Sequence, residues 1–221
     1  MVCDMGHTDS VNRPLPVTRR EQKERTRVAL LDAALRLLAS KSFGSLGLRE
    51  VAREAGVVPT AFYRHFDSME ELGLALIDDS FRTLRRMIRE ARSQDLAFEH
   101  VIHDSVEILV QHVHAHELHF RFVARERSSG MPALRQAIRA EIRLFSSELA
   151  TDLGRFPFLD RWSTEDLGVL ATLIVNTMVS TAEEIVEAPS GRPHAEREIV
   201  RRAEKQLLLI ALGVPAWRST P

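Results

Sequence analysis

The chain has 221 residues, of which 44% are hydrophobic and 28% are charged, and its formal net charge is −1. This composition is typical of a soluble globular protein. No run approaches the roughly 20 apolar residues that a membrane span needs, and the N-terminus lacks the apolar core of a signal peptide. The single cysteine, Cys3, excludes an intramolecular disulfide and disfavours a thiolate metal site. We therefore expect a cytoplasmic protein with one core, or with a small and a larger unit.

Positive charge is concentrated towards the N-terminus. Residues 19–65 contain ten Lys or Arg against five Asp or Glu, whereas residues 66–221 contain 19 against 24. A basic unit on an otherwise acidic chain is typical of a protein that docks on DNA through that unit. Before it, residues 1–18 are polar, contain Pro14 and Pro16, and predict a flexible arm that is either solvated or in contact with DNA.

The first regular element is predicted to be an amphipathic helix over about residues 20–40. Its apolar face is formed at three- and four-residue intervals by Val28, Leu31, Leu35 and Leu38. A loop over residues 40–47 should follow, and the helix should pack across the next two helices.

Residues 49–66 predict two short helices joined by a tight turn. Val51, Ala52 and Ala55 form the apolar side of the first helix. Gly56 ends that helix, because glycine readily takes the left-handed backbone conformation, and Pro59 suits the first turn of the next one. The second helix should be about two turns long. This is the helix-turn-helix arrangement, in which the second helix enters the major groove of DNA.

These residues carry a family resemblance. The Ala-Gly-Val turn and the Tyr-x-His-Phe end resemble the DNA-binding core of TetR-family transcriptional repressors, and residues 25–34 resemble its first helix. Residues 59–66, 71–74 and 125–130 together resemble the subgroup that represses unsaturated fatty-acid biosynthesis genes. The resemblance covers essentially the whole chain from about residue 19. It implies a homodimeric, ligand-responsive DNA-binding repressor with an acyl thioester as effector.

The recognition helix offers groups suited to both phosphates and bases. Thr60, Tyr63 and His65 can donate hydrogen bonds to phosphate oxygens, whereas Arg49 and Arg64 can engage guanine with two donors. Many family members place a lysine near the start of the next helix; this chain has Met69-Glu70-Glu71 there, which puts that phosphate contact in doubt. The predicted DNA-binding set is Arg19, Arg20, Lys23, Arg49, Pro59, Thr60, Ala61, Tyr63, Arg64 and His65.

Residues 69–92 predict one long helix that connects the DNA-binding part to the rest. Its arginine-rich side is either solvated or holds an acidic ligand group. Clusters of Gly and Pro separate further helices at about 97–114, 117–128, 131–154, 163–188 and 194–212. The predicted fold is all-α: an arm over 1–18, a three-helix helix-turn-helix DNA-binding domain over 19–66, and a larger helical ligand-binding and dimerisation domain over 67–221.

The last two helices are apolar over an unusually wide arc. Such surface has to be covered, either inside one subunit or by a second copy of the chain, and the resemblance implies a homodimer through these helices. The predicted interface residues are Leu170, Ile174, Val175, Leu207, Leu208, Ile210 and Ala211.

Apolar and aromatic residues of the larger domain are candidates for an effector pocket. They are Phe98, Ile102, Val106, Leu109, Phe120, Phe122, Leu144, Phe145, Leu173 and Met178. Such a lining suits a long aliphatic effector, and the resemblance implies an acyl thioester such as a long-chain acyl-CoA. A sensor of a drug or another apolar metabolite would share these features, and ordinary core packing is a further alternative. We expect Arg125, Glu126 and Arg127 to lie between this pocket and the connecting helix and to transmit ligand binding.

Six histidines fall between residues 100 and 119. His112 and His116 at i, i+4, with His119, could clamp a metal ion and would make a metal-responsive regulator. The resemblance implies a helix break near residue 116, which disfavours this, so we predict no metal site and surface or pH-responsive histidines instead. The sequence has no phosphate loop, nucleophile elbow or His-Glu-x-x-His motif, so it predicts neither an enzyme nor a cofactor. A helical interaction protein that does not bind DNA is the remaining alternative.

Overall fold

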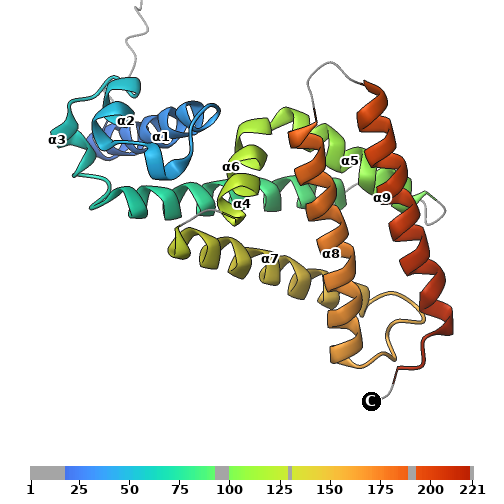
Figure 1. The fold of residues 1–221 in the computed structure, drawn as a ribbon. Coiled ribbons are helices and arrows are strands. Elements are labelled where there is room, and N and C mark those ends of the chain that lie inside the picture. The colour runs from blue at the N-terminus through green and yellow to red at the C-terminus, as the bar shows by residue number, and fades with distance from the viewer. Residues whose placement is uncertain (1–17, 93–99, 129–130, 189–192, 220–221) are drawn as a thin grey trace, which may run out of the picture.

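The computed structural model describes residues 18–92, 100–128, 131–188 and 193–219, and these are helical, with no strand among them (Figure 1). The predicted all-α fold is therefore confirmed. Most of the predicted arm, and the predicted pocket residue Phe98, lie outside the described residues. The elements are α1 (Arg19–Leu38), η1 (Phe43–Ser45), α2 (Leu48–Glu54), α3 (Pro59–Phe62), α4 (Met69–Arg92), α5 (Val101–Ala115), α6 (Glu117–Arg127), α7 (Pro132–Leu153), α8 (Thr164–Glu187), α9 (Pro193–Gly213) and η2 (Val214–Ala216).

Local sequence sets the ends of the N-terminal helices. Thr18 and Glu21 close the start of α1 reciprocally: the Thr18 hydroxyl accepts from the Glu21 N–H, and the Glu21 carboxylate accepts from the Thr18 N–H. After α2, Gly56 adopts a φ of 70°. Its N–H donates to Arg53 O, and the next N–H, of Val57, donates to Ala52 O. This bonding satisfies the last carbonyls of α2 and sets the turn into α3.

The recognition helix is shorter than predicted as a regular helix. α3 spans four residues from Pro59, and hydrogen bonds from the backbone N–H groups of Arg64, His65 and Phe66 continue the turn beyond it. Phe62 and Phe66 are almost fully buried, which anchors this short segment against the rest of the N-terminal unit.

One buried cluster extends from α1 through η1, α2, α3 and α4 into α6 and α7. Leu72 and Leu76 of α4 are fully buried in it, as is Leu134 of α7. Gly73, between the two leucines, allows the closest approach, because a Cβ at that position would lie 2.7 Å from Phe43 Cζ and 2.9 Å from Leu134 Cδ2. Packing is therefore continuous across residue 66, where the sequence predicts a domain boundary.

The remaining helices form a layered body. α8 packs between α7 and α9, and α5 packs on both α8 and α9 (Figure 1). By length and composition alone, α8 is apolar enough to cross a membrane, with a mean hydropathy of 1.4 over 18 residues. Only 33% of that window is buried within the chain. Length and composition alone are weak evidence for a membrane span, because apolar packing helices share them.

Candidate nucleic-acid interface and effector cleft

α3 presents its polar side chains outwards from an aromatic base. Tyr63 is 61% exposed, and Thr60 and Arg64 are also exposed. Beneath them, the Phe62 ring meets the Tyr63 ring edge-on at 5.9 Å. α3 lies at the outer edge of the N-terminal unit, away from the body helices (Figure 1). The segment can therefore offer a hydroxyl, a phenol and a guanidinium to a duplex while the packing of the N-terminal unit stays intact.

Ion pairing divides the cations of this unit into two groups. Arg36 pairs with Glu54 at 3.0 Å, and Lys41 pairs with Glu50. The predicted DNA-binding cations, by contrast, form no salt bridge with any described residue, and all are exposed: Arg19, Arg20, Lys23, Arg49 and Arg64. Unpaired surface cations keep their full attraction for phosphates.

His65 is the least exposed of the polar side chains in the recognition segment. It is half-buried, and its Nδ1 has no hydrogen-bond partner among the described residues. Burial lowers its pKa, and the nearby positive charges of Lys23 and Arg27 lower it further, against the opposing effect of Glu24. A neutral imidazole carries a single N–H donor, so His65 is suited to one hydrogen bond rather than to a charge contact.

Residues of α6 join the N-terminal unit to the body. The Arg125 guanidinium donates to Leu38 O at 3.0 Å, at the C-terminal end of α1, where carbonyls lack helical partners. Glu126, only 3% exposed, accepts from the Phe43 N–H at 3.3 Å, while its Oε2 has no partner among the described residues. Phe122 packs against Phe43 with ring centroids 6.3 Å apart. We call Phe122, Arg125 and Glu126 the clasp.

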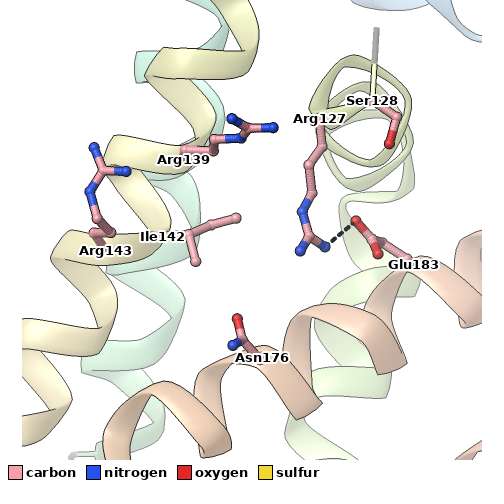
Figure 2. Close-up of a pocket in the computed structure, with 7 residues that line it drawn as sticks. All are labelled: Arg127, Ser128, Arg139, Ile142, Arg143, Asn176 and Glu183. Atoms are coloured by element: carbon pink, nitrogen blue, oxygen red, sulfur yellow. Dashed lines mark hydrogen bonds and ion pairs between the residues drawn. The ribbon is translucent and has the colours of Figure 1, made fainter. Parts of the chain in front are cut away.

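An open cleft of about 510 Å³ lies between α6, α7 and α8. Arg127 on its α6 wall pairs with Glu183 of α8 at 2.7 Å, and Arg139 extends towards Arg127 from α7 (Figure 2). The lining is Arg127, Ser128, Arg139, Ile142, Arg143, Asn176 and Glu183. It is thus mainly polar and cationic, with Ile142 as its one large apolar side chain.

The predicted apolar pocket residues do not line this cleft. Phe122 and Phe145 belong to the cluster shared with the N-terminal unit. Ile102, Val106 and Met178 pack with α9, Leu109 and Phe120 form part of a third cluster, and Leu173 and Leu144 are 49% and 50% exposed. Sequence reasoning missed the arginines of the cleft, although Arg135, Arg139 and Arg143 recur every four residues and so predict a cationic stripe on one helix face.

Two arginines of α4, on the side predicted to be solvated or to hold an acidic ligand group, pair with carboxylates of the chain. Arg82 pairs with Asp78, and Arg85 pairs with Glu141 of α7 at 2.5 Å. Arg85 also stacks over the Phe145 ring, 5.0 Å from its centroid. Arg85 thus ties α4 to α7 and Arg82 is paired within α4 itself, so the cleft between α6, α7 and α8 is the better place for an anion.

The predicted interface residues divide between the interior and the surface. Leu170 and Leu207 are buried within the protomer, and Ile174 and Ile210 pack in the α5–α9 cluster. Leu208 and Ala211 are exposed, and Val175 is half-buried. The large exposed apolar side chains of α8 and α9 are Val169, Leu173, Leu208, Leu209 and Leu212, and of these Leu208 belongs to the predicted set.

The histidines between residues 100 and 119 are spread over α5, α6 and the residues that directly precede these helices, His100 and His116. α5 ends at Ala115, and the backbone of His116 leaves helical geometry with a φ of −131°. His119 faces α4, where its Nδ1 lies 3.0 Å from the hydroxyl of the buried Ser80, and burial lowers its pKa. Among the described residues, no group of three or more His, Cys, Asp or Glu is placed to hold a metal ion.

Comparison with known proteins assigns both parts of the chain. Residues 30–76 match the family model "Bacterial regulatory proteins, tetR family", and residues 98–214 match "Tetracyclin repressor-like, C-terminal domain". Three similar solved structures share the fold at under 25% sequence identity. A TetR-like transcriptional regulator from Rhodococcus sp. RHA1 has a TM-score of 0.61 at 19% identity, over 92% of this chain and 100% of its own. The regulator FadR from Bacillus subtilis, in complex with stearoyl-CoA, has a TM-score of 0.61 at 15% identity, over 83% and 96%. AibR, in complex with isovaleryl coenzyme A and operator DNA, has a TM-score of 0.60 at 14% identity, over 81% and 96%.

Proposed function

This chain belongs to the TetR family of bacterial regulatory proteins, and from that premise we propose that it is a homodimeric repressor of fatty-acid or lipid metabolism genes, with an acyl thioester as effector. The observation that carries the DNA-binding part is that the cations of the N-terminal unit predicted to contact DNA are exposed and form no salt bridge with any described residue, beside the exposed polar side chains of α3. Phosphates attract these cations, and the recognition segment supplies groups that can reach base edges.

Two copies of the chain would bind one operator. α8 and α9 pack against each other far from α3, and both carry exposed leucines, which favours a symmetric pair through these helices (Figure 1). A two-fold dimer presents two recognition helices to half-sites separated by one DNA turn or a multiple of it, so the operator should be palindromic.

The acyl-thioester effector is supported by resemblance. Residues 59–66, 71–74 and 125–130 are similar to the subgroup that represses unsaturated fatty-acid biosynthesis. Two proteins of the same fold bind acyl-coenzyme A compounds. The alternative is a regulator that senses another apolar molecule, such as a drug or metabolite; it would differ in failing to respond to any acyl thioester.

An electrophoretic mobility shift tests target and effector together. The purified dimer is titrated onto the chain's own upstream promoter and a fatty-acid desaturation promoter, with and without oleoyl-CoA. We expect a specific shift whose midpoint changes at least about fivefold on adding oleoyl-CoA, as a coupling of about 1 kcal/mol would produce. Binding that is indifferent to oleoyl-CoA but sensitive to other apolar compounds would favour the alternative effector class.

A further inference from the structure

The cleft between α6, α7 and α8 has an imbalance of charge. It holds three arginines and one carboxylate, and that carboxylate, Glu183, is already paired with Arg127. Arg139 and Arg143 are exposed and form no ion pair with any residue in the described ranges. The acids of α7 have other partners: Glu141 and Glu148 both pair with Arg85 of α4, and Asp152 pairs with Arg155.

We propose that this cleft binds the phosphate groups of a phosphorylated carrier, the coenzyme A portion of an acyl thioester. This assignment of the carrier rests on the proposed function. Guanidinium groups present planar, forked donors that match phosphate oxygens, and two unpaired arginines one helical turn apart can hold a polyanion together. Asn176 and Ser128 add neutral hydrogen-bonding groups to the same walls.

The lining also indicates which part of the ligand the cleft takes. Ile142 is its one large apolar side chain, so a long acyl chain would gain little there from burial. A diphosphate, by contrast, relieves the repulsion between neighbouring guanidinium groups. The cleft therefore recognises the head of the effector and not its tail.

Position ties this anion site to the DNA-binding unit. Arg127 and Ser128 line the cleft, and the two preceding residues, Arg125 and Glu126, hold Leu38 and Phe43 of the N-terminal unit. A phosphate group competes with Glu183 for Arg127 and so acts on the same turn of α6 that forms the clasp. Ligand binding can shift the position of the DNA-binding unit through this turn. The shift is limited by how much the affinity for the ligand differs between two positions of α6.

Calorimetric titration of the full-length protein tests the proposal. The probes are coenzyme A, oleoyl-CoA, oleate and inorganic pyrophosphate. The test variant is Arg139→Gln with Arg143→Gln, and the control is Arg155→Gln, which removes an exposed arginine outside the cleft. We expect the Kd for coenzyme A and oleoyl-CoA to rise at least about tenfold in the double variant only, through loss of charge-assisted hydrogen bonds, while the Kd for oleate stays within about twofold.

Several outcomes would overturn the site. An unchanged Kd for coenzyme A in the double variant, or an equal weakening of oleate, would remove it. Pyrophosphate that binds as tightly as coenzyme A would show a general anion site and reject the carrier. Thermal unfolding checks each variant for folding, and the single variants Arg139→Gln and Arg143→Gln replace the double one if it unfolds. Failure of the proposed function is a separate result: coenzyme A would bind through the arginines, yet no acyl thioester would alter operator binding.

Discussion

Gly73 offers the sharpest test of the packing between the DNA-binding unit and the body. In the change Gly73→Ala, the new methyl group would lie 2.7 Å from Phe43 Cζ and 2.9 Å from Leu134 Cδ2. Neither neighbour can move aside easily, because Phe43 is 2% exposed and packed against Phe122, and Leu134 is fully buried. The substitution therefore inserts a methyl group into a filled core.

Two opposing contributions set the change in the free energy of unfolding. Overpacking of a well-packed core costs about 1–3 kcal/mol, whereas replacing glycine by alanine inside a helix gains about 0.5–1 kcal/mol. The clash should win, with a net loss of about 1–2 kcal/mol. For a chain of this size, each 1 kcal/mol shifts Tm by about 2–4 °C, so Gly73→Ala should lower Tm by about 2–8 °C.

Thermal unfolding at a fixed protein concentration measures this loss. Gly168→Ala is the matched control, because Gly168 also lies inside a long helix but a methyl group added there would meet no atom within 4 Å, so alanine at that position should stabilise. The additional change Phe43→Leu should recover part of the loss in Gly73→Ala, as expected for two residues in direct contact. A Gly73→Ala protein that is as stable as the wild type, or more stable, would refute the argument from close packing.

Four further predictions concern DNA, the clasp, the dimer and pH. Arg64→Ala should weaken operator binding about tenfold, as loss of one bidentate base contact would, whereas equal weakening on all DNA sequences would assign it to phosphates; fluorescence anisotropy on operator and random duplexes separates the two. Arg125→Ala leaves carbonyls at the end of α1 unpaired and should cost about 1–2 kcal/mol in urea denaturation, together with part of the ligand response in the mobility shift. Leu209→Glu with Leu212→Glu, at sites 70% and 65% exposed in the protomer, should yield monomers in analytical ultracentrifugation; an unchanged dimer would place the interface elsewhere. The folded-state pKa of His119 lies below its unfolded value, so the unfolded chain binds more protons as the pH falls. The stability that neutral His119 contributes should therefore be full above about pH 6.5 and decrease as the pH drops through that value. In urea denaturation between about pH 7.5 and 5.5, His119→Asn should reduce this decrease in the midpoint.

The sequence predicts the helices well because their ends depend on neighbouring residues. Gly56 and Pro59 set the turn between α2 and α3, and Ser163 caps α8 by accepting from the Asp166 N–H. These capping and turn signals act over three or four residues. The three- to four-residue spacing of apolar side chains predicts the helices between them. α5 nevertheless begins at Val101, later than the predicted start near residue 97.

The sites formed between helices are harder to predict. An apolar residue in a helix that is apolar on most sides gives no sign of which neighbour it meets, so Leu170 and Leu207 are predicted at an interface but lie in the interior. Phe122 is predicted in a ligand pocket and packs instead on Phe43, 79 positions earlier in the chain. Only the packing of α6, α7 and α8 brings Arg127 and Arg139 to one cleft, and no local pattern encodes that meeting.

The buried cluster that runs from α1 through α4 into α7 means that the DNA-binding unit has no free joint at its base. Any motion started in the body must carry α4 with it as a rigid lever. With 24 residues, α4 is about 36 Å long at 1.5 Å per residue. A tilt of about 5° would then displace its DNA end by about 3 Å, close to the 3.4 Å rise between successive phosphates along one strand. In the proposed dimer, a tilt of this size would move a recognition helix by about one base pair relative to its half-site.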